Sequence, residues 1–197
     1  NSSNVLLDLL NDILDLAKLQ AGKMELHTSP VRILNTFEKI HALFYQKAKS
    51  KGLDFTFEVS TDLEQHFYID ETRLIQVLAN LTSNSVKFTD SGSVNIKATL
   101  IEKTQNSARL KFEVIDTGIG IKQSDINKLF HNFNQLDNST TKAYSGTGLG
   151  LSISKDLVDL MQGEIRVESI INKGSKFWFT INVEPVHVVT EEIEKKP

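Results

Sequence analysis

Amide and cationic side chains recur along one side of the segment Glu71–Phe88, which has the periodicity of an α-helix. At roughly 100° per residue they fall within about 40° of one line, and apolar side chains gather on a neighbouring sector. An amide oxygen suits magnesium, and a lysine can neutralise phosphate. A solvated helix face is the alternative, although asparagine is a poor helix former and an odd choice for such a face. The aligned residues are Arg73, Gln76, Asn80, Asn84 and Lys87.

A glycine-containing segment, Asp116-Thr117-Gly118-Ile119-Gly120, directly follows a strongly alternating strand pattern. The carboxylate of Asp116 could accept a hydrogen bond from an exocyclic amine such as that of adenine. Gly118 and Gly120 would let the backbone come close to a flat ring. Taken alone, the segment favours a simple Asp-x-Gly turn.

A second glycine-rich segment, Ser145-Gly146-Thr147-Gly148-Leu149-Gly150-Leu151, opens a predicted helix. Its alternating glycines leave backbone N–H groups free to face an anion, and the helix start adds its dipole. The segment is neither a dinucleotide fingerprint nor a P-loop, because the third glycine comes one residue early and no Gly-Lys-Ser/Thr follows. A flexible hinge is the alternative.

Between the two segments, Ser124–Tyr144 is polar apart from aromatic anchors at Phe130 and Phe133. This pattern predicts a lid that folds over a ligand. An ordinary long surface loop is the alternative.

The elements that must position these residues alternate between helical and strand periodicity. Because the strands mostly follow one another as hairpins, they favour an α+β fold with helices on one face of a sheet. Helices are predicted after Pro30 to about Ser50, over Glu71–Phe88 and from about Leu149 to Met161, and strands over 55–59, 66–69, 94–100, 110–114, 165–167 and 177–183.

The first segment predicts a further helix, with Ser3 or Asn4 as its cap and Gly22 as its stop. Its apolar positions cover more than half of the circumference, which suits a bundle helix with several neighbours. An ordinary buried helix of the same domain is the alternative. At the other end, the polar segment 186–197 is typical of a linker.

Composition sets outer limits. The 197 residues suffice for one domain with short attachments, and the net charge of -3 argues against a nucleic-acid partner. The absence of cysteine excludes disulfides and thiolate metal sites and fits a reducing compartment. Since no apolar run approaches the roughly 20 residues of a membrane span and no signal peptide opens the chain, we expect a cytoplasmic domain whose parent could be anchored elsewhere.

Taken in order, the motifs resemble the ATPase fold shared by histidine kinases, DNA gyrase, the mismatch-repair ATPases and the large heat-shock chaperone, and specifically that of the histidine kinases. The resemblance covers about residues 30–185. Residues 1–26, which lead into KLQAGKMEL, resemble the end of the second helix of the dimerisation and phosphoacceptor hairpin. The four boxes are IDETRLIQVLANLTSNSVKFT (asparagine), DTGIGI (first glycine), LFHNFNQLD (phenylalanine) and GTGLGLSI (second glycine).

The resemblance implies a two-layer sandwich with a mixed, mainly antiparallel sheet, and a catalytic domain over 27–185 that binds ATP and Mg²⁺. It implies Asn84 as the magnesium ligand, catalytic Asn80 and Lys87 near the phosphates, and Asp116 as acceptor of the adenine amine. Gly174 and Ser175 would help to fix that aspartate. The other residues implied in nucleotide binding are Phe88, Gly118 and Gly120 at the base and Gly146, Thr147, Gly148, Leu149 and Gly150 at the phosphates.

The family phosphorylates a histidine followed by an acidic residue, and none of the histidines here has that context, so each is interpreted as a surface or packing residue. The implied partners are therefore the phosphoacceptor hairpin of the parent chain, present as a homodimer, and the receiver domain of a response regulator. Gln135 stands where many members have a basic lid residue and where hybrid kinases often have glutamine. The histidines are His27, His41, His66, His131 and His187.

Two other functions are compatible with the same motifs. An ATP-driven clamp, as in gyrase, would hydrolyse ATP and dimerise with nucleotide, but the style of the second glycine box and the upstream bundle helix argue against it. A binding module with a decayed site is the other. The intact Asn84, Asp116 and glycine loop argue against decay.

Overall fold

The computed structural model describes residue 10 and residues 13–130 and 148–187. Several predicted features therefore lie outside the described residues. They are the caps Ser3 and Asn4, the lid residues His131, Phe133 and Gln135, and the first half of the second glycine box, including Gly146 and Thr147.

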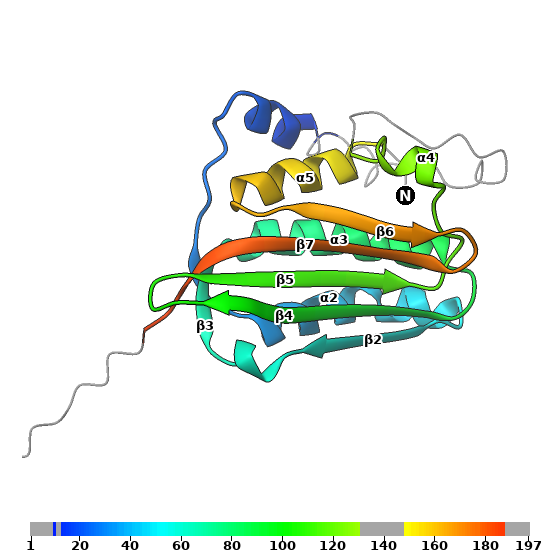
Figure 1. Cartoon of the computed structure of the whole chain (residues 1–197), viewed down its shortest axis with the longest axis horizontal. Coiled ribbons are helices and arrows are strands. Elements are labelled where there is room, and N and C mark those ends of the chain that lie inside the picture. The colour runs from blue at the N-terminus through cyan, green and yellow to red at the C-terminus, as the bar shows by residue number, and fades with distance from the viewer. Residues whose placement is uncertain (1–9, 11–12, 131–147, 188–197) are drawn as a thin grey trace, which may run out of the picture.

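The chain folds into one sheet with helices against one of its faces (Figure 1). The strands are β1 (Ser29–Arg32), β2 (Asp54–Val59), β3 (His66–Ile69), β4 (Ser93–Lys103), β5 (Ala108–Asp116), β6 (Ile165–Ile170) and β7 (Gly174–Pro185). The helices are α2 (Ile33–Ser50), α3 (Glu71–Phe88), the short α4 (Gln123–Ile126) and α5 (Gly150–Leu160), with a 3₁₀ turn η1 (Thr61–Leu63) and a helix over 13–20.

The sheet has the order β1-β3-β7-β5-β4-β2, and β6 lies beside the first half of β7. Among the described strands, β2 and β4 form the one parallel pair, and all other neighbours run antiparallel. The predicted α+β class with a mixed, mainly antiparallel sheet is confirmed. The long β4–β5 hairpin turns at residues 104–107.

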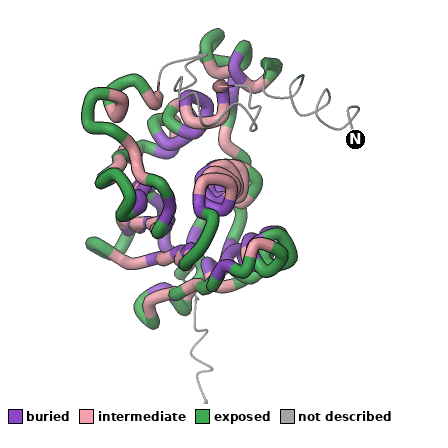
Figure 2. Tube along the Cα trace, turned by 90° about the vertical axis from the view of Figure 1, so that its right-hand side faces the viewer, coloured by how far each residue is buried: buried purple, intermediate pink, exposed green. Residues whose placement is uncertain are grey.

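The core lies between the sheet and the helices, because each element has one apolar face. Strand β5 alternates strictly between buried and half-buried positions, and its inward Leu110, Phe112 and Val114 are fully buried. Phe112 stacks on Phe179 of β7 with ring centroids 5.0 Å apart. Figure 2 shows the buried stretches toward the inside of the molecule, with exposed stretches at loops and on the outer sides of helices.

Helix α3 occupies the centre of the helical layer and has the predicted bounds. Asp70 caps its N-terminus: the side chain of this residue accepts a hydrogen bond from the backbone N–H of Arg73 at 3.1 Å. At its other end, the Lys51 ammonium donates to the carbonyl oxygens of Val86 and Lys87 at 2.8 and 3.1 Å. Side chains thus form hydrogen bonds with a backbone N–H at the start of the helix and with carbonyl oxygens at its end.

Strand β1 was not predicted. It has only four residues, one of them Pro30, and local sequence gives such a segment little strand character. Its conformation depends on antiparallel pairing with β3, in which Ser29 lies opposite Ile69. The predicted second helix accordingly begins at Ile33, after this strand.

The helix over 13–20 packs on the domain through one side. Leu16 is 8% exposed, whereas Leu10, Ile13 and Leu14 are 51, 53 and 50% exposed. It ends as predicted at Gly22, with φ +62°, where Lys23 N–H donates to the Lys18 carbonyl oxygen at 2.9 Å. No helix in the described part of the chain is long and apolar enough to cross a membrane.

Candidate functional site

Asp116 is the last residue of β5 and lies at the centre of a hydrogen-bond network. The residue is 6% exposed. Oδ1 accepts from the backbone N–H groups of Gly118 and Ser175 at 2.9 and 3.2 Å, and Oδ2 accepts from the Ser85 hydroxyl at 3.0 Å. Burial raises the pKa of the Asp116 carboxyl above its ordinary value, although these hydrogen bonds act in the opposite direction.

Gly118 brings the first glycine box against the end of α3. A Cβ atom at this position would lie 2.4 Å from the Phe88 carbonyl oxygen and 2.9 Å from Thr89 Oγ1, so no larger residue fits without a shift. The next residue, Ile119, donates its N–H to the same Phe88 carbonyl at 3.3 Å. Helix α3 and the loop after β5 are therefore in direct contact.

Gly120 adopts φ +69° and lies against the turn between β6 and β7, where a Cβ atom would be 2.1 Å from the Ile170 carbonyl oxygen. The Asn172 N–H of that turn donates to the Ile119 carbonyl at 2.8 Å. Ser169, the penultimate residue of β6, accepts from Ile121 N–H at 2.8 Å. The turn thus holds the glycine loop on both sides of Gly120.

The late Gly174-Ser175 pair, which the family resemblance associated with Asp116, lies beside that residue. Ser175 is opposite Asp116 in the β5–β7 register and donates its N–H to the carboxylate. Gly174 has φ +102°, and a Cβ atom there would lie 1.9 Å from the Asp116 carbonyl oxygen.

Asn80 connects α3 to the beginning of α5. Its Nδ2 donates to the Ser154 hydroxyl at 2.8 Å. A Cβ atom on Gly150, the first residue of α5, would lie 2.4 Å from Asn80 Oδ1. Gly150, the third glycine of the second box, therefore allows α5 to pack closely against Asn80 of α3.

Asn84, Lys87 and Phe88 occupy the last turns of α3, and all are half-buried. The Lys87 ammonium lies 4.9 Å from the centroid of the Phe88 ring. Burial, with a smaller contribution from the charge of Lys47, lowers the pKa of the Lys87 ammonium. Gly148 and Leu149, just before α5, are also among the described residues, and Gly148 has φ +70°.

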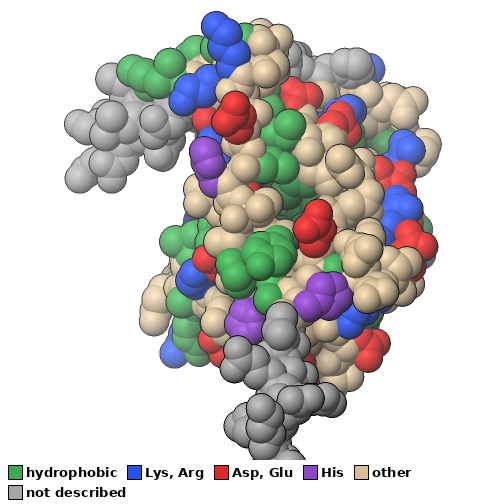
Figure 3. Space-filling view, turned by 90° about the vertical axis from the view of Figure 1, so that its left-hand side faces the viewer, with side chains coloured by type: hydrophobic (Ala, Val, Ile, Leu, Met, Phe, Trp, Pro, Cys, Tyr) green, Lys and Arg blue, Asp and Glu red, His purple; other side chains and the backbone are tan. Residues whose placement is uncertain are grey.

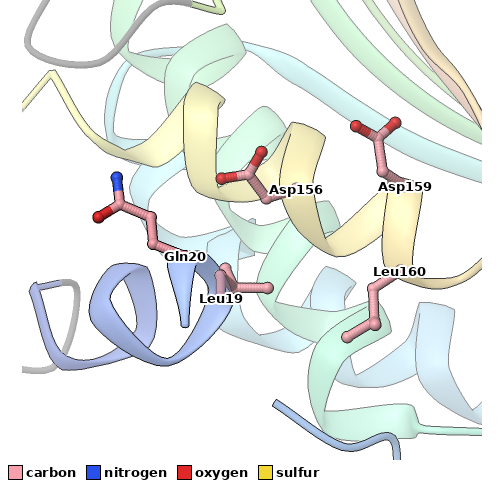
Figure 4. A pocket seen from close by; sticks show the side chains of 5 residues that line it. All are labelled: Leu19, Gln20, Asp156, Asp159 and Leu160. Carbon is pink, nitrogen blue, oxygen red and sulfur yellow. The ribbon is translucent and has the colours of Figure 1, made fainter. Parts of the chain in front are cut away.

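The polar line along α3 is divided between several partners. The Asp15 carboxylate of helix 13–20 accepts from Arg73 Nη1 at 2.8 Å and from Gln76 Nε2 at 3.0 Å. The first two residues of the line therefore hold the N-terminal helix, and Asn80, Asn84 and Lys87 remain nearer to the glycine boxes. Figure 4 shows the helix over 13–20 beside α5, where Leu19 and Gln20 of the first helix and Asp156, Asp159 and Leu160 of α5 line a hollow of about 330 Å³.

The described histidines have the surroundings that their sequence context indicated. His27, His66 and His187 are exposed, and His41 stacks on Phe55 with ring centroids 5.2 Å apart. On the face shown in Figure 3, histidine side chains lie apart from one another, and acidic and basic side chains are interspersed.

Three serines of the network were missed by the sequence analysis: Ser85, Ser154 and Ser169. Ser85 is 2% exposed and lies one helical turn after Leu81 on the apolar side of α3. A polar residue on an apolar stripe is a usable signal, because buried hydroxyl groups need a partner. No comparable pattern marks Ser169 on β6.

The sheet order, the central helix α3, and the convergence on it of a buried aspartate and two glycine segments define an ATPase-type α+β domain. Residues 69–185 match the family described as histidine kinase-, DNA gyrase B- and HSP90-like ATPase. The chain belongs to this family. The family predicted from the four boxes is confirmed.

Relatives at the level of sequence are named as histidine kinases. The signal transduction histidine-protein kinase BarA of Escherichia coli (strain K12) is 38% identical over 186 residues, which are 93% of this chain and 20% of that protein. Hybrid signal transduction histidine kinase B of Dictyostelium discoideum is 41% identical over 180 residues, which are 91% of this chain and 9% of that protein. The chain thus spans a fifth or less of the length of these relatives.

Solved structures agree in fold. Full-length ShkA, crystallised in complex with AMPPNP, superposes with a TM-score of 0.83 and 34% identity over 95% of this chain and 38% of that one. The nucleotide-free catalytic domain of histidine kinase ThkA superposes with a TM-score of 0.63 and 27% identity, covering 79% of this chain and 95% of that domain.

Proposed function

We propose that this chain is the catalytic part of a sensor histidine kinase. It binds Mg-ATP between α3, the loop after β5 and the start of α5, and its γ-phosphoryl group goes to a histidine outside the chain. The catalytic domain covers residues 27–185, residues 1–26 are the end of a phosphoacceptor hairpin, and residues 186–197 are a linker. The family membership and the AMPPNP complex of the ShkA protein support this proposal.

The observation that carries the proposal is the environment of Asp116. Backbone N–H groups of Gly118 and Ser175 orient a buried carboxylate next to a loop that has no room for a Cβ atom at Gly118. A fixed, partly desolvated acceptor beside bare backbone suits a flat base with an exocyclic amine. Adenine has that amine, and Gly118, Gly120 and Phe88 would lie against its ring.

The phosphates would lie between α3 and α5. Asn84 is half-buried, and its amide oxygen is a suitable ligand for Mg²⁺. Magnesium would supply charge neutralisation between the phosphates. Asn80 and Lys87 would contact the phosphate side, and the second glycine box would donate its N–H groups. Of that box, Gly146 and Thr147 lie outside the described residues, and Gly148 and Leu149 directly precede α5. Gly150 lies against Asn80 of α3, and Ser175, outside the box, contacts Asp116.

Phosphoryl transfer asks this domain mainly for positioning and charge neutralisation. The acceptor histidine would come from the first helix of the parent hairpin. The exposed Leu10, Ile13 and Leu14 form an apolar stripe that such a helix, and a second copy in a homodimer, would cover. A receiver domain would then take the phosphoryl group from the histidine, in the cytoplasm.

The test is transfer to the missing hairpin. The chain is mixed with γ-labelled ATP and Mg²⁺, with and without a separately produced parent hairpin. We expect acid-labile label on the hairpin and none on the chain alone. Acid-labile label that persists on the isolated chain would contradict the proposal that the acceptor histidine lies outside it. Steady ATP hydrolysis with nucleotide-dependent dimerisation would indicate an ATP-driven clamp instead of a kinase.

A further inference from the structure

Ser169 on β6 joins the two parts of the proposed base site. Its hydroxyl oxygen accepts from Ile121 N–H, at the end of the glycine loop, at 2.8 Å. The same hydroxyl group donates to the Gly174 carbonyl oxygen at 2.9 Å and lies 2.9 Å from the Ser175 hydroxyl. One side chain therefore contacts both the loop after Asp116 and the strand that faces Asp116.

The direction of these hydrogen bonds follows from counting protons. A serine hydroxyl has one proton, and a carbonyl oxygen can only accept. Since Ser169 gives its proton to Gly174, the Ser175 hydroxyl must donate to Ser169. The Ser175 N–H meanwhile donates to Asp116 Oδ1 at 3.2 Å. Ser175 is held through its hydroxyl by Ser169 and holds Asp116 through its backbone.

Ser169 is half-buried, so its hydrogen bonds are partly shielded from water. Ser169 and Ser175 lie opposite each other in the β6–β7 register, immediately before the turn that packs on Gly120. Loss of the hydroxyl would leave Ile121 N–H and the Gly174 carbonyl without this partner. The hydrogen bonds of Gly118 to Asp116 and of Asn172 to Ile119 would remain, but the end of the glycine loop at Ile121 would lose its link to the strand that faces Asp116.

We propose that Ser169 is a positioning residue for base recognition, which fixes the loop 118–121 relative to Asp116 and thereby sets the preference for adenine. This inference rests on the proposed function, ATP binding at Asp116. It makes Ser169 a determinant of specificity although the residue itself does not contact the nucleotide. Its effect is carried by Ser175 on one side and by Ile121 on the other.

The test compares ATP with inosine triphosphate, in which a carbonyl group replaces the exocyclic amine. Calorimetry with Mg²⁺ gives both dissociation constants for the parent chain, Ser169→Ala and Ser169→Thr. We expect Ser169→Ala to weaken ATP binding by about tenfold and inosine triphosphate binding much less, so that the preference for ATP narrows. Ser169→Thr keeps the hydroxyl group and should keep the preference.

Thr180→Val is the matched control, because the Thr180 hydroxyl accepts from Glu164 N–H at 3.2 Å on the same two-strand unit, away from Asp116. It should lower the unfolding temperature and leave the preference unchanged. The positioning role is overturned if Ser169→Ala keeps the parent's preference, if Ser169→Thr behaves as the alanine variant does, or if Thr180→Val narrows the preference equally. A parent chain that binds neither nucleotide would instead overturn the proposed function itself.

Discussion

Asn80 of α3 lies against Gly150, the first residue of α5, so closely that a Cβ atom on residue 150 would be 2.4 Å from Asn80 Oδ1. The same side chain donates to Ser154 at 2.8 Å, one turn further along α5. The asparagine helix and the second glycine box, 70 residues apart in sequence, therefore form one structural unit. The geometry of α3 and that of the proposed phosphate site depend on each other.

Replacement of Gly150 by alanine tests this dependence. Alanine favours a helix more than glycine does, so without the contact the change would stabilise α5. We expect the clash to win, with a loss of stability of about 1–3 kcal/mol and weaker Mg-ATP binding. Thermal unfolding and calorimetry measure the two effects. Gly22→Ala, at a position with open space and φ +62°, should cost stability alone. Unchanged ATP affinity in Gly150→Ala would show that the contact has no bearing on the site.

Asp116→Asn separates recognition from folding. The amide keeps an oxygen for the N–H groups of Gly118 and Ser175, and the Ser85 hydroxyl can rotate to accept from the new NH₂ group. Because burial disfavours the ionised carboxyl, we expect the unfolding temperature to stay the same or rise. ATP affinity should fall by about 10- to 100-fold, since an acceptor for the adenine amine is lost. A folded variant with parental affinity would exclude Asp116 from the base site.

The raised pKa of Asp116 also predicts opposite pH trends for binding and stability. The folded state binds the Asp116 proton more tightly than the unfolded chain does, because the pKa of this carboxyl is raised above the ordinary value of 3.8 that applies in the unfolded chain. The contribution of Asp116 to the free energy of unfolding is therefore lowest at pH values above the folded pKa. This contribution increases again as the pH falls toward the pKa of the unfolded chain. ATP affinity should instead fall over the same interval, because the protonated carboxyl loses an acceptor site.

The comparison of parent and Asp116→Asn at each pH removes the titration of the nucleotide itself. The ratio of their ATP affinities should shrink as the pH falls through the raised pKa. A ratio that is constant as the pH falls to the ordinary pKa of 3.8 would contradict the role of an ionised Asp116.

The contact of Asp15 with Arg73 and Gln76 predicts a local effect. The Asp15 and Arg73 side chains are 17 and 22% exposed, so their ion pair is better shielded than a surface pair. Asp15→Ala should speed amide hydrogen exchange in residues 13–20 on the order of tenfold and leave ATP affinity unchanged. Asp62→Ala, an exposed change of the same kind, should alter neither. Exchange at the parental rate in Asp15→Ala would mean that apolar packing alone holds this helix.

Local sequence predicted the elements well where periodicity and end signals agree. Helix α3 has the predicted bounds because Asp70 caps it and its apolar positions recur at helical spacing. The strands of the central hairpin were found for the same reason. Strand β1 and the parallel pairing of β2 with β4 were not, because both depend on partners distant in sequence.

The sequence was sufficient to identify the motifs of the site but not the hydrogen bonds between them. The proximity of Ser175 to Asp116 followed from the family resemblance and is present as an N–H to carboxylate hydrogen bond. The hydrogen bond between Arg73 and Asp15, 58 residues apart, could not be predicted from the α3 segment. The alignment of its polar residues had suggested that all of them belong to one site. Such long-range choices are made by packing, which a helical pattern does not encode.

The central claim is that Asp116, the glycine segments and the amides of α3 form one site for Mg-ATP. Titration of ATP with magnesium into the purified chain, followed by calorimetry, addresses it without the need for an acceptor. We predict saturable binding of one nucleotide per chain that is much weaker for Asp116→Asn. A folded chain that takes up no adenine nucleotide in the presence of magnesium would contradict the claim.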